Sequence, residues 1–219
     1  IDHLMKVIQA SALLKINLVT TFIGRNKNLN ITDNLELAEN VWKPILEYAE
    51  SLNVKIAIEN CPMFFTEDEW PGGKNIAVSP AIWRELFKRL PSEYLGLNFD
   101  PSHFIWQEMD YIRPLYEFKD KIFHVHYKDI RVDKEARNEV GVLATPLSYM
   151  VPCIPGHGDV NWARYISALL EIGYQGAACI EVEDKSFEDN NENIENSLKI
   201  SRQYLKQFIH FPEKGRQYA

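Results

Sequence analysis

Four apolar segments of the sequence end in, or close to, a side chain that can bind a metal ion or move a proton. The segments are KIAIE, GLNFD, IFHVHYKD and AACIE, and the side chains are Glu59, Asp100, His126 and Glu181. If these segments are parallel strands of a barrel, their carboxyl ends meet at one face. We therefore expect the four side chains to converge on one ligand.

Three carboxylates in one small site require a positive centre. They would repel one another and resist ionisation unless a divalent cation supplied the opposing charge. Two glutamates, one aspartate and one histidine form a mixed oxygen and nitrogen shell that suits Mn²⁺, Mg²⁺, Co²⁺ or Zn²⁺. An acid at a strand end is by itself more often a solvated cap, so the prediction of one divalent metal ion depends on four strands sharing the pattern.

Helical and strand-like patterns alternate along the chain. Helical spacing of apolar residues occurs at 2–14, 33–52, 79–90, 110–121, 161–172 and 193–209. Apolar runs typical of buried strands occupy 17–24, 54–61, 94–100, 121–129 and 176–184. Residues 130–160 carry no convincing periodic pattern. The alternation predicts an α/β fold with a parallel sheet covered by helices, and residues 1–219 are expected to form a single domain.

Composition narrows the classes of partner. The chain of 219 residues has a net charge of −7, so we expect no nucleic acid and no anionic membrane as partner, because phosphate binding normally needs a basic face. No apolar run approaches the roughly 18 residues of a membrane span, and no signal peptide is visible. The spacing of Cys61, Cys153 and Cys179 indicates neither a disulfide framework nor a structural zinc site, which favours a cytoplasmic location.

Five motifs occur in a fixed order between Asn17 and Asp184, namely IAIENCP, NFDPSH, HVHYKD, PGHGDVNW and IEVED. In this order they resemble the xylose isomerase-like superfamily of sugar isomerases and epimerases, whose relatives include ketose 3-epimerases and inosose dehydratases. The resemblance implies a (β/α)8 TIM barrel with metal ligands Glu, Asp, His and Glu on four successive strands. These roles carry over to Glu59, Asp100, His126 and Glu181, and the resemblance favours His126 over His124 on the same strand face.

A complete barrel of this type is larger than the chain. It usually takes about 250 residues and eight strands, whereas only five strands are predicted here. We therefore expect that about three N-terminal βα units are missing and that the natural product is longer by about 60 to 90 residues. The exposed sheet edges of such a partial barrel favour a partner chain that covers them, and a second copy of the same chain in a homo-oligomer is one such partner.

Six further residues are candidates for binding the substrate. The resemblance implies that His103, in the pattern Asp-x-x-His, contacts a substrate oxygen. Aromatic walls and polar contacts around a sugar are expected from Trp70, Trp106, Lys128, Arg131 and His157. The segment 62–73, which contains Trp70 and ends in two glycines, is expected to act as a lid.

The metal site and the resemblance together predict an isomerase or epimerase that acts on a sugar or sugar phosphate. The ion would stabilise an enediolate, and Glu59 and Glu181 would transfer the proton. Two alternatives stay open, an inosose-type dehydratase and a non-catalytic polyol-binding barrel. A DNA-repair phosphodiesterase with the same barrel is disfavoured, because the chain is acidic and lacks an Asp-x-His pair after His126.

Overall fold

The computed structural model describes residues 1–66 and 72–209 of the chain. Its α-helices are α1 (Asp2–Leu13), α2 (Ile31–Ser51), α3 (Pro80–Arg89), α4 (Ser102–Ile105), α5 (Arg113–Glu117), α6 (Lys134–Val140), α7 (Trp162–Glu171) and α8 (Asn191–Leu205). Its strands are β1 (Leu18–Thr21), β2 (Lys55–Glu59), β3 (Leu95–Phe99), β4 (Ile122–Tyr127), β5 (Asp129–Val132), β6 (Met150–Cys153) and β7 (Ala177–Ile180). Two short 3₁₀ turns are η2 (Lys119–Lys121) and η3 (Pro146–Ser148).

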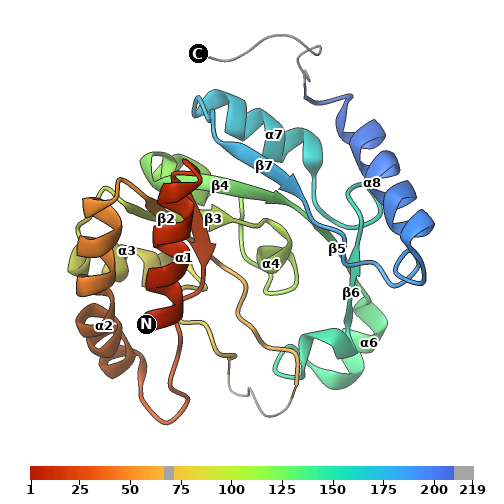
Figure 1. Ribbon diagram of the computed structural model, residues 1–219. Coiled ribbons are helices and arrows are strands. Elements are labelled where there is room, and N and C mark those ends of the chain that lie inside the picture. Colours follow the sequence, from red (N-terminus) through yellow and green to blue (C-terminus); the bar gives the residue numbers. More distant parts are fainter. Residues whose placement is uncertain (67–71, 210–219) are drawn as a thin grey trace.

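The strands form a curled parallel sheet with helices outside it. Within the described residues, the sheet order is β1-β2-β3-β4-β7, and every neighbouring pair is parallel. The antiparallel hairpin of β5 and β6 lies beyond the end of β4, next to α6 (Figure 1). Because all five strands of the sheet run in the same direction, their carboxyl ends share one rim.

Burial explains why the inner strands lack polar alternation. All five residues of β3 are buried, as are Ile56, Ala57 and Ile58 of β2, because side chains on one face fill the curl of the sheet and those on the other meet the helices. Three helices begin at an asparagine whose side chain accepts a backbone N–H, namely Asn30 before α2, Asn161 before α7 and Asn190 before α8. These caps fix the points at which the chain turns back over the sheet.

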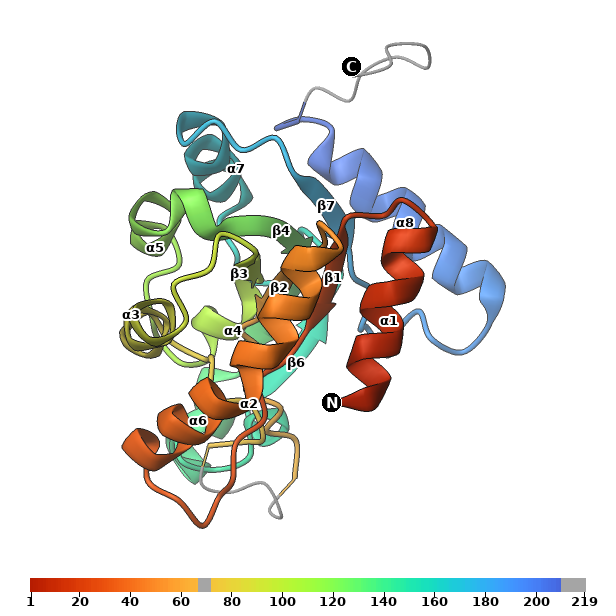
Figure 2. The ribbon, with the colours of Figure 1, turned by 60° about the vertical axis from the view of Figure 1, so that its left-hand side comes forward.

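The sheet is open in the described part of the chain. The outer strands β1 and β7 each pair with one neighbour there, and both lie toward the side that carries α1 and α8 (Figure 2). Ala177, Ala178 and Cys179 of β7 are exposed, in contrast to the buried β3. Five parallel strands thus form a curled portion of the closed barrel, which has eight.

Several elements differ from the sequence prediction. Residues 130–160 contain α6, η3 and the β5–β6 hairpin, whose strands have four residues each and are too short to give a periodic signal. The helix expected at 110–121 is reduced to the five residues of α5 and the turn η2. The one-turn helix α4 was not expected. No helix in the described ranges is long and apolar enough to cross a membrane.

Candidate metal centre

The four predicted ligand residues meet at the carboxyl rim of the sheet. Glu59 is the last residue of β2, and Asp100 follows β3 directly. His126 is the fifth residue of β4, and Glu181 follows β7. One donor atom of each side chain lies within 4.8 Å of the others. The parallel strands therefore bring together side chains that lie up to 122 positions apart, from 59 to 181.

The donor atoms surround a common point without satisfying one another. Nδ1 of His126 lies 2.7 Å from Oε2 of Glu181, and 3.8 Å both from Oε1 of Glu59 and from Oδ2 of Asp100. Oδ2 of Asp100, Nδ1 of His126 and Oε2 of Glu181 are buried, and none has a hydrogen-bond partner in suitable geometry. Buried polar atoms are normally paired, so this arrangement fits a cation held between the four side chains.

Asparagine side chains fix the backbone from which two of the carboxylates project. Asn60 accepts from the N–H of Asp100 at 2.8 Å and donates to its carbonyl at 2.9 Å. Asn75 donates to the carbonyls of Glu59 and Cys61 at 2.8 and 2.7 Å. The Ser102 N–H donates to Oδ1 of Asp100 at 2.8 Å, which leaves Oδ2 of Asp100 facing the cluster.

Asn98 positions the imidazole of His126. Its amide Nδ2 lies 3.0 Å from Nε2 of His126, and its Oδ1 lies 2.8 Å from Nδ1 of His124. When Nδ1 of His126 holds an ion, Nε2 carries the ring proton. With its amide turned end for end, Asn98 would then accept a hydrogen bond from this N–H through Oδ1 and donate one to His124 through Nδ2. His124 is suited to accept, because burial and the nearby His126 lower its pKa and keep it neutral.

Replacing Asn98 by leucine is expected to weaken metal binding by about 10–100-fold, the usual cost of losing the group that orients a ligating histidine. Leucine has a similar size but offers no acceptor to Nε2 of His126. Isothermal titration of the metal-free variant with Mn²⁺ measures the effect. The half-buried Asn193 of α8 supplies the matched control, since Asn193→Leu changes none of the residues of the cluster. Equal affinity of Asn98→Leu and the parent would contradict this role.

Protons take the place of a cation in the metal-free cluster. Burial acts to lower the pKa of His126, but Asp100, Glu181 and Glu59 outweigh it and raise the pKa to about 10. Burial acts to raise the pKa of Asp100, but the nearby His103 and His126 hold it well below its usual range. The imidazolium of His126 thus balances the carboxylates, and an ion must displace its Nδ1 proton.

The metal-free protein is therefore expected to lose stability as the pH rises. The folded-state pKa values of His126 and His103 are about 10, above the ordinary 6.5. Their contribution to the free energy of unfolding is present in full below pH 6.5 and is lost as the pH rises through about 10. The reason is that the folded state binds more protons than the unfolded state in this range. Urea unfolding in the presence of a chelator measures the trend. A midpoint that increases between about pH 7 and 10 would contradict the assignment, and His126→Gln should flatten the profile.

A cavity of about 490 Å³ opens beside the cluster. His103 and Lys128 line it, together with apolar side chains that include Ile130 and Met150. Lys128 is 4% exposed, and its Nζ lies 3.3 Å from Oε1 of Glu181 and 2.6 Å from Glu183. Two of the predicted substrate-binding residues therefore adjoin the metal ligands.

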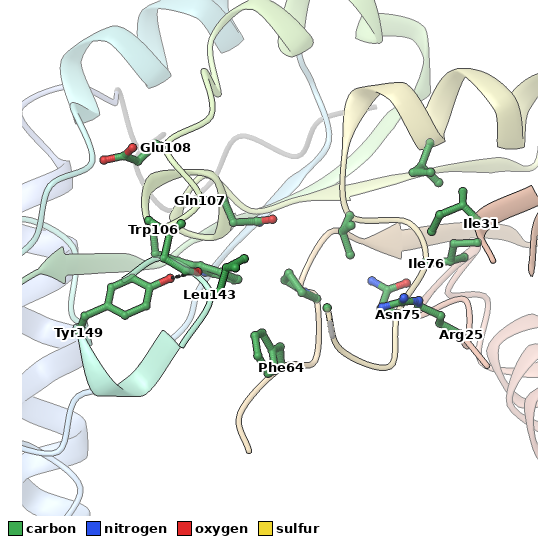
Figure 3. Close-up of a pocket in the computed structure, with 15 residues that line it drawn as sticks. Arg25, Ile31, Phe64, Asn75, Ile76, Trp106, Gln107, Glu108, Leu143 and Tyr149 are labelled. Carbon is green, nitrogen blue, oxygen red and sulfur yellow. Dashed lines mark hydrogen bonds between the residues drawn. The ribbon is translucent and has the colours of Figure 1, made fainter. Parts of the chain in front are cut away.

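Trp106 lines a second cavity of about 550 Å³ (Figure 3). The Trp106 ring is buried against Phe64 and Tyr149, and its Nε1 donates toward Nδ1 of His103 at 3.5 Å. Phe64, Trp106 and Tyr149 all line the second cavity (Figure 3). Trp106 thus contacts Nδ1 of His103, and substrate contact by Trp106 stays a prediction.

Two of the other predicted substrate-binding residues, Arg131 and His157, are not brought to the cluster. Arg131 is exposed on β5, and His157 is exposed with its ring centroid 6.3 Å from that of Phe187. Neither lines the cavity beside His103 and Lys128 as the described residues define it. Trp70 and the other residues of the predicted lid from 67 to 71 lie outside the described residues. The roles of these residues stay predictions.

Sequence reasoning missed the supporting side chains. Asn98 precedes Asp100 by two residues, so a polar residue inside the apolar run LGLNF was a usable signal. Cys61 lies two residues after Glu59, so its closeness to the rim was also readable from the sequence. Asn60, Asn75 and Glu183 gave no signal, because their partners become neighbours only in the folded chain.

Comparison with known proteins assigns the fold to a family. Residues 1–206 match the family described as xylose isomerase-like TIM barrel. The chain belongs to this family. Its members include sugar epimerases and dehydratases, and the motifs that predicted the fold all lie within the matched range.

Curated relatives of the family are longer than the chain. An uncharacterized protein YfiH of Bacillus subtilis (strain 168) is 28% identical over 179 residues, which are 77% of this chain and 51% of that protein. An inosose dehydratase of Lactiplantibacillus plantarum is 27% identical over 117 residues, which are 52% of this chain and 38% of that protein. The chain thus spans about half or less of the length of these relatives.

Solved structures share the fold at low sequence identity. The structure of an IOLI protein with a bound zinc atom is 18% identical and has a TM-score of 0.69, covering 96% of this chain and 70% of that one. A D-tagatose 3-epimerase-like protein is 21% identical with a TM-score of 0.64, covering 93% of this chain and 67% of that one. At these identities the likeness establishes the fold alone.

Proposed function

We propose that the protein is a divalent-metal-dependent isomerase or epimerase of an unphosphorylated sugar, with Glu59, Asp100, His126 and Glu181 as metal ligands. The observation that carries the proposal is the convergence of four donor atoms within 4.8 Å, three of them buried without a hydrogen bond. Membership of a family that contains sugar epimerases supports it.

A bound divalent ion would polarise a substrate carbonyl and stabilise the negative charge that develops when the neighbouring carbon loses a proton. Glu59 and Glu181 come from β2 and from the end of β7, so they approach the cluster from opposite sides of β3 and β4. One carboxylate can remove a proton, and the other can return it. Return to the same carbon from the opposite face gives an epimer, and return to the next carbon gives an isomer.

His126 and Lys128 keep Glu181 ionised. Burial acts to raise the pKa of Glu181, but the contact with His126 and the ammonium group of Lys128 outweigh it and lower the pKa. Glu181 is therefore ionised at neutral pH and ready to accept a proton. His103, on α4, lines the same cavity as Lys128.

The charges in the cavity favour a neutral substrate. Lys128 is paired with Glu181 and Glu183, and the cavity lining contains one further charge of each sign, Lys185 and Glu188. The lining also contains apolar side chains such as Ile130, Leu147 and Met150, which suit the C–H face of a sugar. A phosphate would add negative charge next to three carboxylates, so an unphosphorylated sugar or polyol ketone is preferred.

Proton exchange tests the proposal. Candidate ketoses and their phosphates would be incubated with Mn²⁺-loaded protein in deuterated water, and deuterium at the carbon beside the carbonyl would be followed by NMR. We expect exchange with at least one neutral ketose, and none with the chelated protein. Faster exchange with sugar phosphates would contradict the neutral substrate, and exchange with no sugar would favour a polyol-binding barrel.

Removal of water is the second candidate reaction. The same carboxylates that abstract a proton can protonate a departing β-hydroxyl group. The inosose dehydratase that is 27% identical over 52% of the chain specifically favours this alternative. Mass spectrometry of the products separates the two reactions, because a dehydratase releases a product lighter by one water whereas an epimerase or isomerase conserves the mass.

A further inference from the structure

A second group of donor atoms adjoins the first. Glu59, Cys61 and His103 each offer one atom, and these atoms lie within 4.8 Å of one another. Cys61 follows β2 two residues after Glu59, and His103 lies on α4. Nε2 of His103 is 3.7 Å from Oε1 of Glu59 and 3.6 Å from Oδ2 of Asp100. Glu59 therefore belongs to both groups.

The buried imidazole of His103 points to a ligand. The side chain is 4% exposed, and its Nε2 is buried without a hydrogen-bond partner in suitable geometry. Cys61 is a free thiol that is 5% exposed. A nitrogen, a sulfur and a carboxylate oxygen that face one another away from solvent are the donor set of a borderline or soft cation.

We propose that Glu59, Cys61 and His103 form a second cation site, selective for a thiophilic divalent ion such as Zn²⁺, with the Glu59 carboxylate shared between the two ions. Thiolate ligands select Zn²⁺ over Mg²⁺ and Mn²⁺, which prefer oxygen. The inference goes beyond the proposed function, because the proton transfer derived above needs one ion only.

The charge balance and the proton positions allow the second ion. Its two positive charges would replace one proton on Cys61 and one on His103, so the net charge of the cluster would not change. Nε1 of Trp106 lies 3.5 Å from Nδ1 of His103, which is too long for a strong hydrogen bond. Ion binding at Nε2 would place the ring proton on Nδ1 and would give up only this long hydrogen bond.

Cadmium is the probe, because a cadmium–thiolate bond gives an ultraviolet charge-transfer band that oxygen and nitrogen ligands do not give. Metal-free protein would be titrated with Cd²⁺, and bound ions per chain would be counted by elemental analysis after gel filtration. We expect the parent to bind two ions, one of which produces the band. Cys61→Ser should lose the band and one ion and keep the other.

Two other cysteines provide matched controls. Cys179→Ser changes an exposed thiol on β7, and Cys153→Ser changes a buried thiol that already donates to the Val151 carbonyl at 3.3 Å. Both variants should keep both ions and the band. If Cys61→Ser proves unfolded by circular dichroism, His103→Gln serves instead. It keeps the thiol but should weaken the band-producing ion by more than about tenfold.

Several results would overturn the second site. They are the absence of the band in the parent, its persistence in Cys61→Ser, unchanged affinity in His103→Gln, and a single bound ion in the parent. Failure of the proposed function is distinguishable, because it would appear as absent proton exchange in Mn²⁺-loaded protein, whatever the cadmium band shows. Failure of the second site would leave Mn²⁺ binding and proton exchange intact.

Discussion

Replacing Glu181 by glutamine is expected to lower kcat by about 10²–10⁴-fold, the usual contribution of a general acid or base. Glutamine has nearly the same shape, and its amide oxygen can still accept from Lys128, which lies 3.3 Å from Oε1 in the parent. It cannot take up a proton from carbon. The fold should persist, because Glu181 lies on the rim rather than in the apolar core.

Proton transfer must be separated from metal binding, since Glu181 is proposed to do both. Turnover is therefore measured at a Mn²⁺ concentration that saturates each variant, with bound metal confirmed by elemental analysis. Glu93→Gln is the matched control, because Glu93 is exposed at the amino end of β3, the opposite end of the sheet. Metal-saturated Glu181→Gln with more than about a tenth of the parent turnover would count against the acid–base role.

Replacing Asp100 by asparagine should have the largest effect on metal binding. The Asp100 side chain is fully buried, and its Oδ1 already accepts from the Ser102 N–H. Asparagine can keep that hydrogen bond but removes the negative charge that Oδ2 directs at the cluster. We expect the affinity for Mn²⁺ to fall by more than about 100-fold. Loss of a residue that only orients a ligand costs at most about that much.

Thermal unfolding with and without metal measures this loss independently of any substrate. At a free Mn²⁺ concentration of 100 times the Kd, the parent should gain about 2.7 kcal/mol of stability, and Asp100→Asn should gain almost none at that concentration. Asp120→Asn makes the same change at an exposed site in η2, before β4, and should behave as the parent. Equal stabilisation of Asp100→Asn and the parent would show that Asp100 does not bind the ion.

The order of strands and helices was predictable because buried parallel strands leave a strong apolar signal. Runs such as KIAIE and LGLNF consist mainly of apolar residues, and the structure places them in neighbouring strands. The same property locates the rim, since the first polar residue after each run marks the carboxyl end of a strand. Glu59, Asp100 and Glu181 could therefore be placed together without coordinates.

Features that depend on contacts distant in sequence could not be predicted. The β5–β6 hairpin is specified by pairing between Asp129–Val132 and Met150–Cys153, and each strand is too short to be periodic. The role of Asn75 depends on its reach to the end of β2, and that of Glu183 depends on Lys128. Motif spacing predicts substrate contact by Arg131 and His157, but it does not fix the direction of a side chain in a hairpin or a turn.

The central claim is that four side chains from separate strands hold one ion, and anomalous X-ray diffraction at the manganese edge tests it most directly. Crystals grown with Mn²⁺ should show a single strong peak at bonding distance from one donor atom each of Glu59, Asp100, His126 and Glu181. A peak at any other place, or no peak at these four residues in crystals of protein that binds Mn²⁺ in solution, would contradict the account.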